Sequence, residues 1–96
     1  MNTPSLFSLQ QRRILITGSY RGLGLAIARG LAGAGATVVL NGRNEEGVAK
    51  AVEALRADGL DAHGAVFDIT DEASVVDARG RIRKDLGPLH GLVNNA

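Results

Sequence analysis

Three glycines with the spacing Gly18-xxx-Gly22-x-Gly24 lie in the stretch Thr17–Gly24, which reads TGSYRGLG. An apolar run leads into this stretch, and an alanine- and leucine-rich helical pattern leaves it. The free N–H groups and the positive dipole end at the start of a helix attract a phosphate, and glycine lets the backbone approach it closely. The stretch therefore predicts a cradle for a dinucleotide diphosphate, with a purely structural turn as the alternative. Its spacing differs from G-x-G-x-x-G, and no Gly-Lys-Ser/Thr of a P-loop follows.

The elements that must position this turn alternate regularly along the chain. Strand-like runs lie at about 12–17, Thr37–Asn41, Ala62–Asp68 and Leu89–Asn94, and helical patterns lie at about 22–33, 45–57 and 71–86. Alternation at this spacing predicts an α/β fold with a parallel sheet and right-handed crossovers. We treat residues 1–96 as one dinucleotide-binding domain.

Helical periodicity and capping residues refine these elements. The first helix carries Leu23, Ile27 and Leu31 on one face, which we expect to be buried. Asn44 and Thr70 are the expected N-caps of the second and third helices. The apolar positions on the second helix, which we also expect to be buried, are Val48, Val52 and Leu55.

Composition excludes several classes of function. The chain of 96 residues has a formal net charge of +1, which gives no electrostatic reason to expect nucleic acid or a membrane as partner. It has no cysteine, so disulfides, thiolate nucleophiles and cysteine metal sites are excluded. His63 and His90 stand alone and are expected to be solvated loop histidines. Met1–Gln10 has no apolar signal core, and no run approaches the roughly 20 residues of a membrane span. We expect a soluble, cytoplasmic protein with a small-molecule substrate.

The motifs together resemble the short-chain dehydrogenase/reductase family. They are the glycine stretch of Thr17–Gly24, Asp68 at the close of the third strand, and Asn94-Asn95-Ala96 at the close of the fourth. The resemblance implies a Rossmann-type sheet of β-α-β-α-β-α-β with strand order 3-2-1-4, in which the first two helices lie on one face and the third on the other. The segments at 6–9, 39–44 and 66–71 resemble gluconate 5-dehydrogenases (5-keto-D-gluconate reductases). That likeness implies interconversion of a secondary alcohol and a ketone in a polyol or sugar acid, such as gluconate and 5-ketogluconate.

The resemblance also assigns cofactor contacts. The three glycines would bind the cofactor, with Ser19 and the backbone N–H of Leu23 contacting phosphate or ribose oxygens. Asp68 would accept a hydrogen bond from the adenine amino group, with Ile69 flanking the ring; capping of the next helix is the alternative for Asp68. Asn94 would brace the sheet and border the cofactor ribose with its backbone. Tyr20 is expected to be an exposed turn residue.

Two arginines bear on the choice of nicotinamide cofactor. Relatives that prefer NAD place a carboxylate at the end of the second strand, where it accepts hydrogen bonds from the ribose hydroxyls. Here that position is Gly42, Arg43 follows it, and Arg21 lies in the glycine turn. A 2′-phosphate would meet two guanidiniums and no carboxylate, so we expect NADP(H), with NAD(H) as the alternative. The alternative for the arginines is two solvated loop residues.

The family's catalytic serine and Tyr-xxx-Lys pair follow its Asn-Asn-Ala-Gly motif, and no residue here can be given those roles. The one tyrosine is Tyr20, and position 24 is glycine where the pair needs lysine. We therefore expect the cofactor-binding N-terminal portion of an oxidoreductase that is homo-oligomeric when complete and inactive as this portion alone. The alternatives are a non-catalytic NADP(H)-binding protein, an inactive truncated gene product, and a flavodoxin- or receiver-like domain.

Overall fold

The computed structural model of the chain describes residues 9–95. Residues 6–8 and Ala96, which carry part of the family resemblance, lie outside the described residues. Seven elements follow one another in the described part: β1 (Arg13–Ile16), α1 (Gly22–Gly33), β2 (Thr37–Gly42), α2 (Glu45–Ala57), β3 (Ala62–Val66), α3 (Glu72–Leu86) and β4 (Gly91–Val93).

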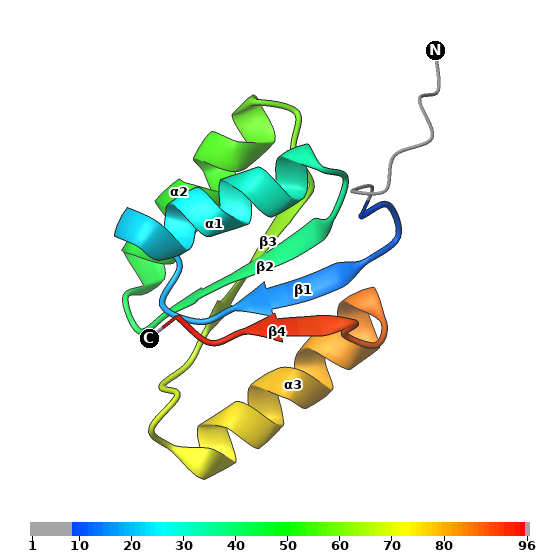
Figure 1. Ribbon diagram of the computed structural model, residues 1–96. Helices are drawn as coiled ribbons and strands as arrows, with labels where there is room; N and C mark the ends of the chain where they lie inside the picture. Colours follow the sequence, from blue (N-terminus) through cyan, green and yellow to red (C-terminus); the bar gives the residue numbers. More distant parts are fainter. Residues whose placement is uncertain (1–8, 96) are drawn as a thin grey trace.

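The strands form one parallel sheet in the order β3-β2-β1-β4, which confirms the predicted topology. Figure 1 shows α1 and α2 on one face of the sheet and α3 on the other, as expected. β3 and β4 are shorter than predicted. In β4 only three residues pair with β1, from Gly91 beside Ile14 to Val93 beside Ile16.

Two apolar layers hold the helices to the sheet. Along β2, Val38 and Leu40 pack with the residues under α1 and α2, whereas Val39 packs with those under α3. This alternation is the two-residue period of a strand, and it explains why a strand covered on both faces is apolar throughout. The predicted face of α2 is confirmed, since Leu55 is fully buried and Val48 and Val52 are nearly so.

The prediction for the buried face of α1 is wrong. Leu23 is 71% exposed, and the residues of α1 that are buried are Gly24, Ala28 and Ala32. Small residues at spacings of four let the helix backbone lie close to the sheet beside the glycine turn. Leu31 packs at the margin of the same cluster and is only partly buried.

The N-cap prediction holds for one helix and fails for the other. Asn44 caps α2, because its side chain accepts a hydrogen bond from Gly47 N at 2.9 Å. The cap of α3 is Asp71 and not Thr70: its Oδ1 accepts from Ala73 N and Ser74 N. A carboxylate both satisfies those N–H groups and complements the helix dipole.

Candidate functional site

The glycine turn connects the end of β1 to the start of α1. Gly18 and Gly22 have φ values of 58° and 61°, a left-handed conformation that favours glycine. A Cβ on Gly22 would meet no atom within 4 Å, so its backbone faces open space. A Cβ on Gly24 would lie only 2.8 Å from Ser19 Cα and closer still to the Gly18 carbonyl oxygen. Gly18 and Gly22 therefore meet a conformational requirement, and Gly24 meets a steric one.

The start of α1 is open to an anion. Its N-cap residue, Arg21, makes no side-chain capping hydrogen bond, and the first turn of the helix contains no acidic residue. The other helices of the described part differ, since Asn44 and Asp71 cap them. An uncapped N-terminus beside the exposed backbone of Gly22 can receive a diphosphate, so the turn fits a dinucleotide cofactor.

The side chain of Ser19 is engaged inside the protein, and its predicted contact with phosphate or ribose oxygens stays a prediction. That side chain is fully buried, and its Oγ donates to Ile16 O at 2.6 Å and accepts from Asn41 N at 2.9 Å. The hydroxyl thus ties the turn to β1 and β2.

Asn41 is a residue of the site that the sequence reasoning missed. It is 1% exposed, and its Oδ1 accepts a hydrogen bond from Gly18 N at 3.1 Å. Its Nδ2 donates to Phe67 O at 3.1 Å and to Ala65 O at 3.2 Å. One amide therefore joins the glycine turn to the end of β3. The available signal was a single polar residue inside the apolar run of β2.

The asparagines after β4 brace the same turn. Thr17 Oγ1 lies 3.2 Å from Asn94 Oδ1 and accepts a hydrogen bond from Asn95 N at 3.0 Å. Asn95 Nδ2 donates to Gly18 O at 3.0 Å. Asn94 therefore contacts the threonine, while Asn95, to which we had assigned no role, holds the turn directly. A border between the Asn94 backbone and a ribose stays a prediction.

A cleft of about 820 Å³ opens where β1, β2 and β3 end. In parallel α/β sheets this edge is the usual place for a ligand. The structure brings together Gly18, Arg21, Arg43, Asp68 and Ile69 from the predicted set, and it adds Tyr20 and Asn41 to them. Asn94 lines an adjoining apolar groove of about 420 Å³ between α3 and β4, which shares Phe67 and Ile69 with the cleft.

Asp68 is held as a carboxylate with one oxygen left toward the cleft. Its Oδ1 accepts from Thr70 Oγ1 at 2.7 Å and Thr70 N at 2.9 Å. These two hydrogen bonds, with a smaller effect of the Arg43 charge, hold the pKa of Asp68 below its usual value. Oδ2 lies 3.9 Å from Arg43 Nη1. The alternative that Asp68 caps the next helix is wrong, because Asp71 caps α3. Asp68 instead closes a local turn with Thr70 through one of its two oxygens.

Tyr20 was expected to be exposed, and this expectation is wrong. The side chain is half-buried and packs at the edge of the core under α1 and α2. Its ring lies against Gly42 and Gly47, and the guanidinium carbon of Arg21 lies 5.2 Å from the ring centroid. The aromatic ring thus forms part of the wall of the cleft.

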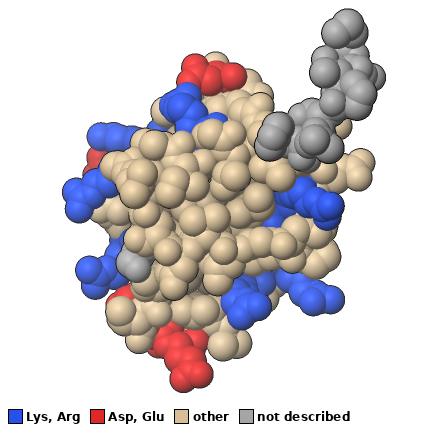
Figure 2. All heavy atoms as spheres, viewed as in Figure 1, with Lys and Arg blue, Asp and Glu red and all other residues tan. Residues whose placement is uncertain are grey.

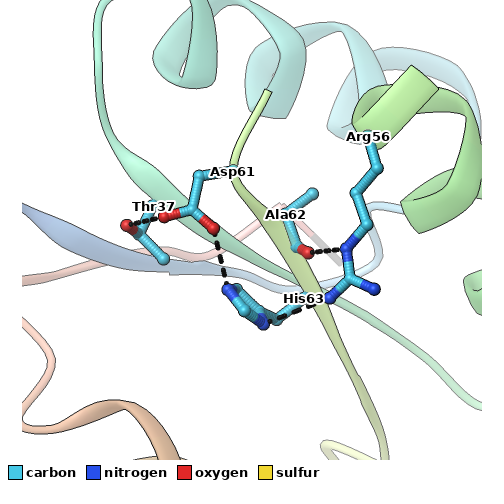
Figure 3. A network of polar contacts seen from close by, with 5 residues as sticks. All are labelled: Thr37, Arg56, Asp61, Ala62 and His63. Atoms are coloured by element: carbon cyan, nitrogen blue, oxygen red, sulfur yellow. Dashed lines mark hydrogen bonds and ion pairs between the residues drawn. The ribbon is translucent and has the colours of Figure 1, made fainter. Parts of the chain in front are cut away.

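The histidines are not simply solvated. Figure 3 shows His63 between Asp61 and Arg56: Nε2 lies 2.9 Å from Asp61 Oδ1, and Nδ1 lies 3.3 Å from Arg56 Nη2. His90 Nδ1 accepts from Arg13 N at 2.9 Å. The His63 network lies where β3 begins, so it is at the opposite end of the strands from the cleft. No group of acidic residues and histidines in residues 9–95 is arranged to hold a metal ion.

Surface properties add two findings. On the face that Figure 2 shows, charged side chains lie around the rim and the centre is uncharged, so no basic patch for nucleic acid is seen there. None of the helices described is both long and apolar enough to cross a bilayer.

Comparison with known proteins gives consistent matches. The family model for short chain dehydrogenase matches residues 12–96. Gluconate 5-dehydrogenase of Gluconobacter oxydans is 51% identical over 96 residues, which are all of this chain and 38% of that protein. The 5-keto-D-gluconate 5-reductase of Escherichia coli K12 is 43% identical over 91 residues, which are 95% of this chain and 36% of that protein.

A solved structure agrees with these matches. The gluconate 5-dehydrogenase of Burkholderia cenocepacia, crystallised with NADP and tartrate, superposes with a TM-score of 0.89 at 49% identity, covering 94% of this chain and 35% of its own. The chain therefore spans a little over a third of the length of the relatives that it matches.

Proposed function

Since the chain belongs to the short chain dehydrogenase family, we propose that it forms the cofactor-binding part of an NADP(H)-dependent oxidoreductase. The proposed reaction interconverts a secondary alcohol and a ketone in a polyol or sugar acid, with gluconate and 5-ketogluconate as the first candidates. Its relatives of that name support this substrate class. A bound nicotinamide cofactor would supply the hydride acceptor or donor.

The diphosphate would lie against the glycine turn. The uncapped start of α1 offers free N–H groups, among them that of Leu23, and Gly22 leaves its backbone open to the ligand. Gly18 would allow the left-handed bend of the turn, and Gly24 would allow α1 to approach the turn closely. The side chain of Ser19 is buried and its N–H donates to Asn41 O at 2.8 Å, so the carbonyl oxygen of Ser19 is the group that could accept a hydrogen bond from a ribose hydroxyl.

The adenosine half would occupy the cleft at the ends of β2 and β3. Asp68 would accept a hydrogen bond from the adenine amino group through Oδ2, with Ile69 beside the ring. The observation that carries NADP over NAD is the charge around this cleft: Arg21 and Arg43 line it, and no side chain stands at Gly42. Each charge-assisted hydrogen bond to a 2′-phosphate would contribute roughly 1.5–3 kcal/mol. The relative crystallised with NADP agrees with this choice.

Calorimetric titration of the chain with NADP⁺ and NAD⁺ tests the cofactor. We expect NADP⁺ to bind at least about ten-fold more tightly, and Arg43→Ala to remove most of that difference while leaving NAD⁺ binding nearly unchanged. Arg83→Ala is the matched control, because Arg83 is an exposed arginine in the last turn of α3. Equal affinities would refute NADP selectivity, and no binding of either dinucleotide would refute the cradle.

The substrate is tested separately, by following NADPH loss in the presence of 5-keto-D-gluconate with the protein that contains this chain. A second candidate function is an NADP(H)-binding protein without catalysis. Tight NADP(H) binding without turnover of any sugar-acid ketone would support that alternative.

A further inference from the structure

The ring of Tyr20 fills the space above Gly42. A Cβ built on Gly42 would lie 2.8 Å from Tyr20 Cε1 and closer still to Cδ1, and it would also approach Val48 Cγ2 at 3.1 Å. On the other edge of the ring, a Cβ on Gly47 would lie 2.7 Å from Cδ2 and 2.8 Å from Cε2. The ring therefore sits in a slot that exists only because both positions are glycine.

The backbone of Gly42 would accept a side chain if the ring were absent. Its φ is not among the positive values that restrict glycines such as Gly18 and Gly22. The obstacle is thus steric and comes mainly from one aromatic side chain. This matters because the end of the second strand is where a carboxylate selects the unphosphorylated ribose of NAD.

The same ring contacts one of the two cleft arginines. The Arg21 guanidinium carbon lies 5.2 Å from the Tyr20 centroid, within the range of a cation–π interaction. Arg21 is exposed, so without such a contact its long side chain would sample many rotamers in solvent. Stacking on a ring that is itself wedged between two glycines fixes the charge beside the cleft.

We propose that Tyr20 is a positioning residue that determines cofactor selectivity. It excludes any carboxylate at position 42, which would repel a 2′-phosphate, and it holds Arg21 where it can bind that phosphate. The inference rests on the proposed function for its ligand. Its steric half, the exclusion of a side chain at position 42, can be tested without any ligand.

The steric half is tested by thermal unfolding of four proteins. Gly42→Asp should lower the melting temperature relative to the wild type, because the new side chain collides with the ring. Gly30→Asp is the matched control, since a Cβ there meets nothing within 4 Å and the glycine lies on the exposed side of α1. Tyr20→Ser combined with Gly42→Asp should regain more than half of the loss seen in Gly42→Asp alone. If Gly42→Asp and Gly30→Asp have the same melting temperature, or if the double variant melts no higher than Gly42→Asp, the proposed exclusion is refuted.

The selectivity half is tested by equilibrium binding of NADP⁺ and NAD⁺. Tyr20→Phe keeps the ring and should keep the wild-type ratio of affinities. Tyr20→Leu fills the slot without a π-face, and the ratio should fall about two- to five-fold, with the change confined to NADP⁺. The Tyr20→Ser, Gly42→Asp double variant should shift preference toward NAD⁺. An unchanged ratio in Tyr20→Leu would refute the positioning of Arg21.

The two proposals fail in different ways. If the wild-type chain binds neither dinucleotide, the proposed function fails, and the thermal comparison still decides whether Tyr20 closes position 42. If the wild type prefers NADP⁺ and the Tyr20 variants do not change that preference, the proposed function stands and this inference fails. Binding is also readable from Tyr20 emission, because the chain has one tyrosine and no tryptophan.

Discussion

The side-chain oxygen of Asn41 lies 3.1 Å from the backbone nitrogen of Gly18 and accepts its hydrogen bond. The same amide donates to two carbonyl groups at the end of β3, so three segments distant in sequence share one buried group. The shape of the candidate diphosphate cradle thus depends on a side chain from a neighbouring strand. Folding alone therefore fixes the backbone of the turn, so binding a phosphate there would cost little conformational entropy.

We predict that Asn41→Ala destabilises the chain by about 2–4 kcal/mol, because three hydrogen bonds are lost in a buried place. Asn44→Ala is the control: it removes an exposed amide that caps α2, and it should cost about 1 kcal/mol. Urea unfolding of both variants measures the difference. Equal losses would mean that the Asn41 amide does not hold the turn.

We predict opposite effects for two glycine substitutions in α1. Gly24→Ala should cost about 3 kcal/mol, because the new methyl group would lie 2.6 Å from Asn95 Nδ2 and 2.8 Å from Ser19 Cα. Gly30→Ala should stabilise the chain by about 0.5–1 kcal/mol, since a helix-interior glycine with open space around it gains from a methyl group. Urea unfolding gives both values. A neutral Gly24→Ala would show that close approach of α1 to the turn is not required.

The class of fold followed from periodicity and glycine placement, whereas the order of the strands was implied by the family resemblance, and the structure confirms both. The packing of α1 did not follow, because large apolar residues such as Leu23 suggested the buried face. The requirement that α1 begin against the backbone of the turn outweighs the burial of leucine, so Gly24 and Ala28 face the sheet. The spacing of large apolar residues along a sequence does not indicate how closely two backbones approach each other.

The candidate site was predicted unevenly for a similar reason. Charged residues at the ends of strands, such as Arg43 and Asp68, could be placed from the order of the elements alone, and they do line one cleft. Residues whose role depends on a partner in another segment could not be placed. Tyr20 needs two distant glycines and Asn41 needs the backbone after β3, and no local pattern contains those partners.

The polar network at the start of β3 predicts a pH effect on stability. The pKa of Asp61 is held below its usual value of 3.8, chiefly by the hydroxyl of Thr37, whose oxygen lies 2.6 Å from Oδ2, and His63 adds to the effect (Figure 3). A lowered pKa contributes stability that is complete above the unfolded value and is lost as the pH falls through the folded value. Because the Asp61 side chain is 61% exposed, we expect no more than about 0.5 kcal/mol.

Urea unfolding between pH 3 and pH 7 checks this effect. The difference between the wild type and Asp61→Asn should shrink as the pH falls below about 4. Thr37→Val, which removes only the hydroxyl, should lose most of the same pH-dependent part. A difference that grows as the pH falls would have the wrong sign and would exclude this assignment.

The sheet edge at β4 predicts self-association of the chain. In the described residues β4 pairs only with β1, and Leu92 is 63% exposed beside the apolar groove of about 420 Å³ between α3 and β4. Unpaired backbone groups next to exposed apolar side chains are a template for pairing with another copy. Sedimentation velocity at micromolar concentration should therefore show dimers or larger species.

Leu92→Lys should weaken that association by about ten-fold or more, since burying one leucine contributes about 1.5–3 kcal/mol and lysine protects open edges. Leu23→Ser is the matched control: Leu23 is 71% exposed, but it lies on α1 rather than beside the β4 edge. That variant should associate like the wild type. A wild-type chain that stays monomeric, or a Leu23→Ser variant affected as strongly as Leu92→Lys, would show that β4 is not the associating edge. The comparison works because both changes remove one exposed leucine and only one of them alters the sheet.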